Sequence, residues 1–260
     1  VIEFILSKLF GSRIIYDFDD AIWIPNTTAE NKIASWFKAV WKVKYICQWA
    51  YKISAGNNYL LDYARKYNSN SFLIPTCIDA VNAHNRLKQH QNSEVVIGWT
   101  GSHSTLTYLD EILPVIERLS REYSFIFMVI ANKDPRLQLS NYRFKPWKEE
   151  TEVEDLLSFD IGVMPLSPDP WSEGKCGFKL IQYLALGIPA VASPVGVNKD
   201  IIKEGNNGFL ATTPDEWYIH LSKLLTDLEL RKTMGHRGRQ LVVENYSVQA
   251  YRNRFLQLFS

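Results

Sequence analysis

At 260 residues, with 46% hydrophobic and 22% charged side chains, the chain has an ordinary globular composition and can build one large or two modest domains. Its net charge of +1 provides no general attraction to nucleic acid, and no apolar run reaches the roughly 20 residues of a membrane-spanning helix. The three cysteines lie far apart without CxxC spacing, which favours reduced thiols in the cytoplasm.

The first part of the chain alternates strand and helix patterns. Strands are expected at 13–18 (RIIYDF), 52–55 (KISA) and 71–75 (SFLIP), and the opening VIEFILSKLFGS leads straight into the first of them. Helical spacing occurs in 36–51 and in 59–64. This alternation predicts parallel βαβ units, and the polar stretch 83–93 predicts a linker between two domains.

The second part repeats the alternation after the linker. Strands are expected at 95–99, 124–131, 142–146, 160–165 and 190–193, with an edge strand in 206–211. Helices are expected from the loop 100–105 to 119, at 150–158, 178–185, 199–205, 214–226 and 228–246, and a last one at 247–259. Two doubly wound α/β units are the architecture that this order predicts.

Two loops carry residues suited to phosphate. TGSHST, at 100–105, follows a strand and opens a helix, so Gly101 allows a tight turn while Ser102 can cap the helix or donate to phosphate oxygens. A plain helix-capping loop is the alternative for this stretch. Lys175 and Lys179 flank the start of another helix, where free backbone N–H groups and the positive end of the helix dipole also favour a diphosphate.

Other polar and aromatic groups allow one or two interpretations each. DFDD, at 17–20, could hold a divalent cation, or Asp19 and Asp20 could cap the next segment or line a cleft. Asn57, at a strand end, could contact a ligand or cap the following helix. Trp147, between a short strand and a helix, could pack internally. The basic, aromatic stretch 36–51 suits either a membrane surface or a helix that covers the sheet.

The stretch 160–196, and within it GKCGFKLIQYLALGIPAVASPVG, resembles the signature region of family 4 glycosyltransferases, the group 1 transferases of the GT-B fold. The pattern aligns through Gly187, Pro189 and Gly196. Of its two glutamates, the second falls on Gln182 and the first on Gly174, one residue after Glu173. Gln182 can still bond a hydroxyl group through its amide.

The resemblance implies an α/β fold of two facing Rossmann-like domains, of which the N-terminal one is incomplete because this chain is expected to be a fragment. It divides the chain into a partial acceptor-side domain (1–82), the linker (83–93), a nucleotide-sugar-binding domain (94–246) and a helix that crosses back to the first domain (247–260).

The resemblance also assigns residues to a donor site, although it assigns no catalytic residue. The donor diphosphate would contact Gly101, Ser102, Lys175 and Lys179, and the donor sugar and ribose would contact Glu173, Gly177, Phe178 and Gln182. The nucleobase would lie near Trp147 and Pro165, and the acceptor side of the cleft would carry Asp19, Asp20 and Asn57.

The implied activity is transfer of a sugar from a nucleoside diphosphate sugar to a glycan or lipid-linked acceptor, with retention of anomeric configuration, without a metal or other cofactor. The expected setting is polysaccharide synthesis in the bacterial cytoplasm, with peripheral contact to the inner face of the membrane. Two alternatives stay open: a non-catalytic sugar-nucleotide-binding protein, which the loss of both glutamates favours, and a sugar-nucleotide epimerase.

Overall fold

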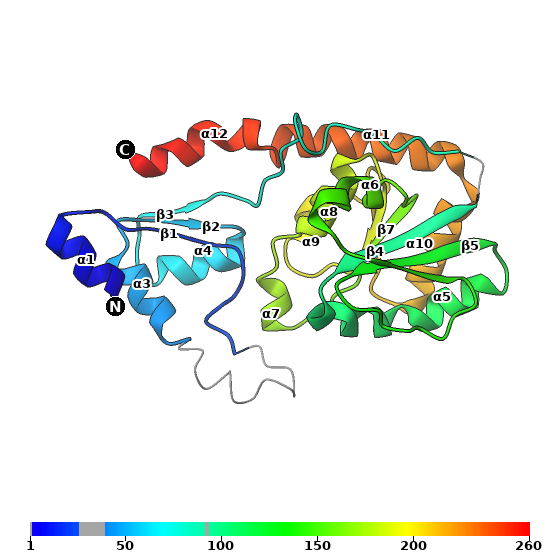
Figure 1. Cartoon of the computed structure of the whole chain (residues 1–260), viewed down its shortest axis with the longest axis horizontal. Helices are drawn as coiled ribbons and strands as arrows, with labels where there is room; N and C mark the ends of the chain where they lie inside the picture. The colour runs from blue at the N-terminus through cyan, green and yellow to red at the C-terminus, as the bar shows by residue number, and fades with distance from the viewer. Residues whose placement is uncertain (1, 26–39, 92–93) are drawn as a thin grey trace. The chain divides into compact units, whose positions relative to one another are not determined.

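The computed structural model describes residues 2–25, 40–91 and 94–260, apart from the side chains of residues 2, 3 and 6. The chain divides into two compact units (Figure 1). Unit 1 comprises Val1–Thr76, Pro168–Cys176 and Tyr251–Ser260, and unit 2 comprises Cys77–Ser167 and Gly177–Ala250. The part of the basic, aromatic stretch at 36–39 lies outside the described residues.

Unit 1 contains a parallel sheet of three strands in the order β1-β2-β3. The three predicted strands are confirmed, as β1 (Ile15–Phe18), β2 (Lys52–Ala55) and β3 (Ser71–Leu73). The helices α3 (Lys42–Trp49) and α4 (Asn58–Arg65) bury Val43, Cys47, Leu60, Leu61 and Ala64 in the core with β1 and β2. One face of α3 therefore packs against the sheet.

The opening residues were expected to lead straight into the first strand, but a helix comes before it. Residues Ile2–Phe10 form a helix, α1, whose Phe4 stacks on Trp49 of α3 with ring centroids 4.6 Å apart. The prediction was wrong because the periodicity of a short apolar run does not distinguish a helix from an extended segment that leads into a strand.

Unit 2 is built on a six-stranded parallel sheet in the order β6-β5-β4-β7-β8-β9. Its strands are β4 (Val95–Gly101), β5 (Phe125–Ala131), β6 (Tyr142–Pro146), β7 (Ile161–Met164), β8 (Ala190–Ala192) and β9 (Gly208–Leu210). All six predicted strands are confirmed. Counted within the unit, this order is 3-2-1-4-5-6, the order of the dinucleotide-binding Rossmann sheet, whose ligands bind where the strand order reverses, here between β4 and β7.

Helices cover both faces of this sheet, as Figure 1 shows. On one face α5 (Leu113–Ser120) and α10 (Pro214–Thr226) pack with Val95, Ile97 and Trp99 of β4, and on the other α8 (Phe178–Ala185) packs with Val96. This alternation follows from the two-residue period of a strand. The remaining helices of unit 2 are α6 (Glu152–Leu156), α9 (Asn198–Ile201), α11 (Leu228–Asn245) and the 3-10 helices η2 (His103–Glu111) and η3 (Glu149–Thr151).

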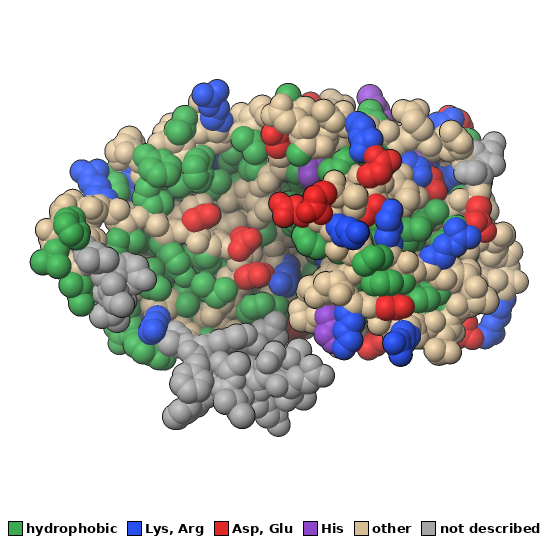
Figure 2. Space-filling model, in the orientation of Figure 1, with side chains coloured by type: hydrophobic (Ala, Val, Ile, Leu, Met, Phe, Trp, Pro, Cys, Tyr) green, Lys and Arg blue, Asp and Glu red, His purple; other side chains and the backbone are tan. Residues whose placement is uncertain are grey.

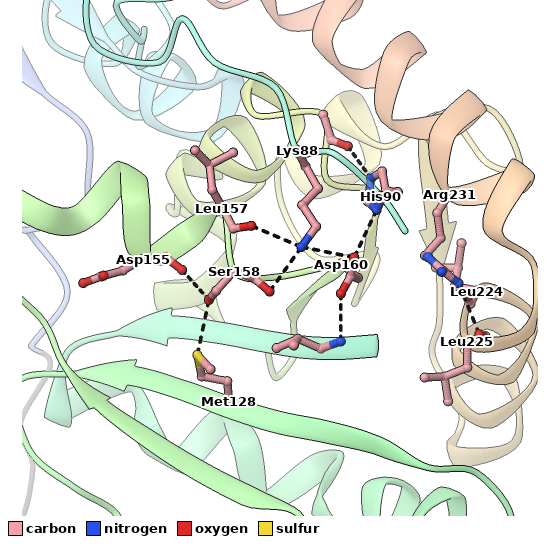
Figure 3. Close-up of polar contacts among 12 residues, drawn as sticks. Lys88, His90, Met128, Asp155, Leu157, Ser158, Asp160, Leu224, Leu225 and Arg231 are labelled. Atoms are coloured by element: carbon pink, nitrogen blue, oxygen red, sulfur yellow. Dashed lines mark hydrogen bonds and ion pairs between the residues drawn. The ribbon is translucent and has the colours of Figure 1, made fainter. Parts of the chain in front are cut away.

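The segment that precedes β4 is fixed to unit 2 by a buried polar network (Figure 3). The Asp160 carboxylate lies 3.2 Å from Lys88 Nζ and 3.3 Å from His90 Nδ1, and it accepts the N–H of Val96 at 3.0 Å. Burial alone raises the pKa of Asp160, but the hydrogen bond to His90 and the charge of Lys88 outweigh it and hold this pKa below its ordinary value. The described part of the expected linker is thus joined to the sheet of unit 2.

The last helix, α12 (Val248–Leu256), and the 3-10 helix η4 (Gln257–Phe259) bring the chain end to unit 1. Lys52 Nζ of β2 donates to the carbonyl oxygens of Gln257 (2.6 Å) and Ser260 (2.8 Å). Across the ranges that the structure describes, none of the helices has the length and apolar character needed to cross a membrane.

Candidate functional site

The carboxyl end of β4 brings a lysine and a glycine together. Lys179 Nζ of α8 lies 4.4 Å from the ring centroid of Trp99, which is fully buried. A Cβ atom on Gly101 would lie 2.5 Å from the Trp99 ring and 2.8 Å from Lys179 Nζ, so only glycine fits here. The structure thus places a cation beside Gly101, where the strand order reverses.

Tyr183 holds α8 in this position. Its side chain is fully buried against Gly162 of β7, and its hydroxyl oxygen accepts the N–H of Thr100 at 3.0 Å. Burial raises the pKa of Tyr183, so the hydroxyl stays neutral. Tyr183 therefore joins α8 to both β4 and β7 in the core.

The loop after β4 differs from its prediction. Ser102 makes no capping hydrogen bond through its side chain; its Oγ lies 2.9 Å from Ser104 Oγ instead. The chain continues as the 3-10 helix η2, not as an α-helix, and the N–H of His103 donates to Asn132 Oδ1 at 2.8 Å. Ser102 remains exposed at the end of β4.

Gly177 is the N-cap of the signature helix α8, and its φ of +70° is the left-handed conformation that favours glycine. Phe178 is exposed, whereas Gln182 is only 2% exposed and its Nε2 has no hydrogen-bond partner among the described residues. Sequence reasoning missed Asn198, which is fully buried with Oδ1 likewise unpartnered within the described chain and Nδ2 donating to Ser193 O at 3.0 Å. No motif in the sequence marks this asparagine.

The two residues predicted near a nucleobase follow strands of the same sheet. Trp147 comes directly after β6, is 41% exposed, and donates through Nε1 to Glu152 Oε1 at 2.9 Å. Pro165 comes directly after β7 and is buried. Both positions are at carboxyl ends of strands, the end at which Gly101 and Lys179 lie.

The remaining predicted residues gather in unit 1. Lys175 Nζ forms an ion pair with Asp20 at 2.9 Å, and Asn57 Nδ2 donates to the carbonyl oxygens of Lys175 (3.0 Å) and Glu173 (3.3 Å). The carbonyl oxygen of Asp19 accepts Cys176 Sγ–H at 3.0 Å. Between Pro165 and Lys175, residues Pro170–Glu173 form a short helix, α7, capped by Asp169.

The signature is therefore divided between the two units. Glu173 and Lys175 belong to unit 1, while Gly101, Lys179 and Gln182 belong to unit 2. Asp20 belongs to the DFDD stretch, for which a divalent cation site was one interpretation; its carboxylate forms an ion pair with Lys175 instead. Among the residues that the structure describes, no three His, Cys, Asp or Glu side chains gather as a metal site would require.

A cavity of about 510 Å³ opens elsewhere on unit 2. It is lined by residues at the amino ends of β4, β5 and β6, among them Glu94, Arg121, Asn141 and Arg143. This is the end of the sheet opposite to Gly101 and Lys179, so the cavity is not part of the site described above.

Comparison with known proteins gives a family match over residues 94–227, to the model described as "Glycosyl transferases group 1". N-acetyl-alpha-D-glucosaminyl L-malate synthase of Bacillus anthracis is 32% identical over 100 residues, which are 38% of this chain and 25% of that protein. The capsular polysaccharide biosynthesis glycosyltransferase CapM of Staphylococcus aureus is 26% identical over 167 residues, 61% of this chain and 44% of that protein. The chain thus spans less than half the length of either relative.

The fold has close counterparts among solved structures. Anabaena HepE, solved in complex with UDP and glucose, superposes with a TM-score of 0.74 over 99% of this chain and 74% of its own length. Its sequence identity of 13% makes this a likeness of fold.

Proposed function

Because this chain belongs to the group 1 glycosyl transferases, we propose that it serves the transfer of a sugar from a nucleoside diphosphate sugar to an acceptor hydroxyl group. In this reaction the bond between the anomeric carbon and the diphosphate oxygen breaks, and the acceptor oxygen bonds to that carbon. The nucleoside diphosphate departs with the bonding electrons, and the proton of the acceptor hydroxyl group is released to the solvent. The resemblance of the signature supports retention of anomeric configuration, and the name of CapM supports a role in polysaccharide synthesis.

One observation carries the proposal: the ammonium group of Lys179 lies beside Gly101 at the carboxyl end of β4. In an open α/β sheet this is the position at which ligands bind. Lys179 is the second residue of α8, so the first N–H groups of this helix add the positive end of a helix dipole beside it. A diphosphate that leaves with an added negative charge would be stabilised by both.

The amide of Gln182 supports a sugar or ribose contact. A buried donor without a partner costs about 1–3 kcal/mol unless a ligand or a water molecule satisfies it. Gln182 Nε2 is such a donor among the described residues. In the sequence pattern of the family, this position is occupied by the second glutamate. We infer that a ligand hydroxyl group accepts this N–H.

Calorimetric titration with UDP, GDP and ADP, with and without EDTA, tests the proposal. We expect one of the three nucleotides to bind, with an affinity that EDTA leaves unchanged, because cationic side chains and N–H groups take the place of a metal. Binding that requires a divalent cation would contradict the metal-independent site. Failure of all three nucleotides to bind would contradict the donor site itself.

A second function is favoured by a specific observation. The two glutamates of the family pattern are replaced by Gly174 and Gln182, which would suit a protein that binds a sugar nucleotide without transferring the sugar. Incubation of the chain with the matching nucleotide sugar and a glycan acceptor separates the two functions. A glycosylated product supports the transferase, whereas tight binding without a product supports the binding protein.

We also propose a peripheral contact with the cytoplasmic face of a membrane. Phe10 of α1 is 77% exposed and Trp41 is 56% exposed. Lys8 lies over the ring of Phe4, and Lys42 lies over the ring of Trp41. Figure 2 shows hydrophobic side chains over the end of unit 1 that carries α1. Apolar side chains flanked by lysines suit an anionic bilayer. We expect sedimentation with vesicles that contain phosphatidylglycerol; equal sedimentation with neutral vesicles would contradict the electrostatic part of this proposal.

A further inference from the structure

Asn57 connects the end of β2 to the loop 168–176 of the signature. Its Nδ2 group donates to the carbonyl oxygens of Glu173 and Lys175, at 3.3 and 3.0 Å. Its Oδ1 accepts the N–H of Leu60 at 2.9 Å and so caps α4. One side chain thus ties two main-chain positions of the loop to the sheet of unit 1.

The contacts around Asn57 leave it no capacity for a ligand. The side chain is 4% exposed, both of its amide N–H groups point to carbonyl oxygens, and its oxygen serves the helix cap. An asparagine amide has two donors, so a ligand acceptor could be served only by releasing the loop.

Neighbouring contacts hold the same loop against the same strands. A Cβ atom on Gly56 would lie 2.4 Å from Cys176 Sγ, so the loop packs directly on the backbone at the end of β2. Cys176 Sγ–H donates to Asp19 O, and Lys175 Nζ pairs with Asp20, both just after β1. The loop is therefore fixed at Glu173, Lys175 and Cys176, and Asn57 supplies its buried amide anchor.

We propose that Asn57 is a positioning residue: it holds the main chain of Glu173 and Lys175, and thereby the two charged side chains that the family resemblance assigns to the donor. This inference rests on the proposed function. It replaces the direct ligand contact that the sequence suggested for Asn57 with an indirect role through the loop. Of the two sequence interpretations of Asn57, the helix cap is the one that the structure contains.

The decisive variant is Asn57→Ser, because serine keeps a good helix cap and removes the two amide donors. Asn68→Ser is a matched control: Asn68 Nδ2 also donates to two carbonyl oxygens of unit 1, those of Cys47 (3.0 Å) and Ala50 (2.7 Å), but not to the loop. Each variant loses two hydrogen bonds to main-chain carbonyl oxygens, so their melting temperatures are expected to fall by similar amounts.

Two readouts distinguish positioning from general stability. Hydrogen exchange of the amides of Gly174 and Lys175, which donate to Trp171 O and Ser172 O, is expected to accelerate about tenfold in Asn57→Ser only. The Kd of the nucleotide that binds is expected to rise about fivefold in Asn57→Ser and to stay unchanged in Asn68→Ser.

Each result bears on a different claim. Unchanged exchange in the loop of Asn57→Ser would overturn the anchoring role even if nucleotide binding is weakened. Equal weakening of binding by both variants would overturn the positioning role. A wild-type chain that binds none of the three nucleotides would overturn the proposed donor function, and the positioning role with it.

Discussion

Lys179→Met is the sharpest test of the donor site, because methionine keeps most of the length of the stem and removes the charge. Lys179 Nζ lies 4.4 Å from the Trp99 ring, so part of its interaction energy is a cation–π contact worth about 1 kcal/mol when partly desolvated. For a chain of this size that loss corresponds to a melting temperature lower by roughly 2–4 °C. The fold is therefore expected to survive the substitution.

The loss of donor binding is expected to be larger than the loss of stability. A hydrogen bond from a charged donor contributes about 1.5–3 kcal/mol, which corresponds to a Kd raised roughly 10- to 100-fold. The assay is calorimetric titration with the nucleotide that binds the wild type, and Lys199→Met is the control because Lys199 is exposed on α9 of the same unit. If Lys179→Met binds as tightly as the wild type, the assignment of this lysine to the diphosphate is wrong.

Further predictions concern the buried titratable groups. Asp160→Asn leaves the Lys88 ammonium without its carboxylate, so the free energy of unfolding is expected to fall by about 3 kcal/mol in chemical denaturation, while Asp200→Asn, at an exposed site, leaves it unchanged. Because folding lowers the pKa of Asp160, this carboxylate stabilises the fold fully above its pKa in the unfolded chain, and the stabilisation is lost as the pH falls through its folded pKa. The melting temperature of Asp160→Asn should therefore fall less steeply with decreasing pH than that of the wild type. Parallel curves of melting temperature against pH would contradict this coupling. Burial raises the pKa of Cys176 to about 12, so at neutral pH this thiol should not react with Ellman's reagent until the chain unfolds. Rapid modification of Cys176 in the native chain, located by mass spectrometry, would contradict its buried position.

The strands were predictable from the sequence because their signal is local. VVIGW and SFIFMVIA are continuous apolar runs of the kind that parallel strands buried on both faces require, and they form β4 and β5. Alternation with helices then indicates parallel pairing, and the structure together with its counterparts confirms two Rossmann-like units of the GT-B class. Helix α1 lacked such a signal, since its apolar run is short and its packing partner Trp49 lies far along the chain.

The side-chain partners of the site were not predictable, because they depend on tertiary contacts. Nothing in DFDD indicates that Asp20 pairs with Lys175, which follows 155 residues later. The serines of TGSHST have good helix-capping chemistry, yet the helix that follows is of the 3-10 type and Ser102 Oγ approaches Ser104 instead. Local propensity describes what a side chain can do, and the packing of the whole unit selects what it does.

The signature itself shows why sequence and structure divide the site differently. Read along the chain, 173–182 is one polar motif, and a single donor contact surface is the simplest interpretation. In the structure its first half is hydrogen-bonded and packed on the ends of β1 and β2, while its second half begins at Gly177 and enters the core of unit 2 as α8. The turn at Gly177 is therefore the point at which one sequence motif becomes two structural elements. Asn57→Ser therefore tests the half of the motif that belongs to unit 1, and Lys179→Met tests the half that belongs to unit 2.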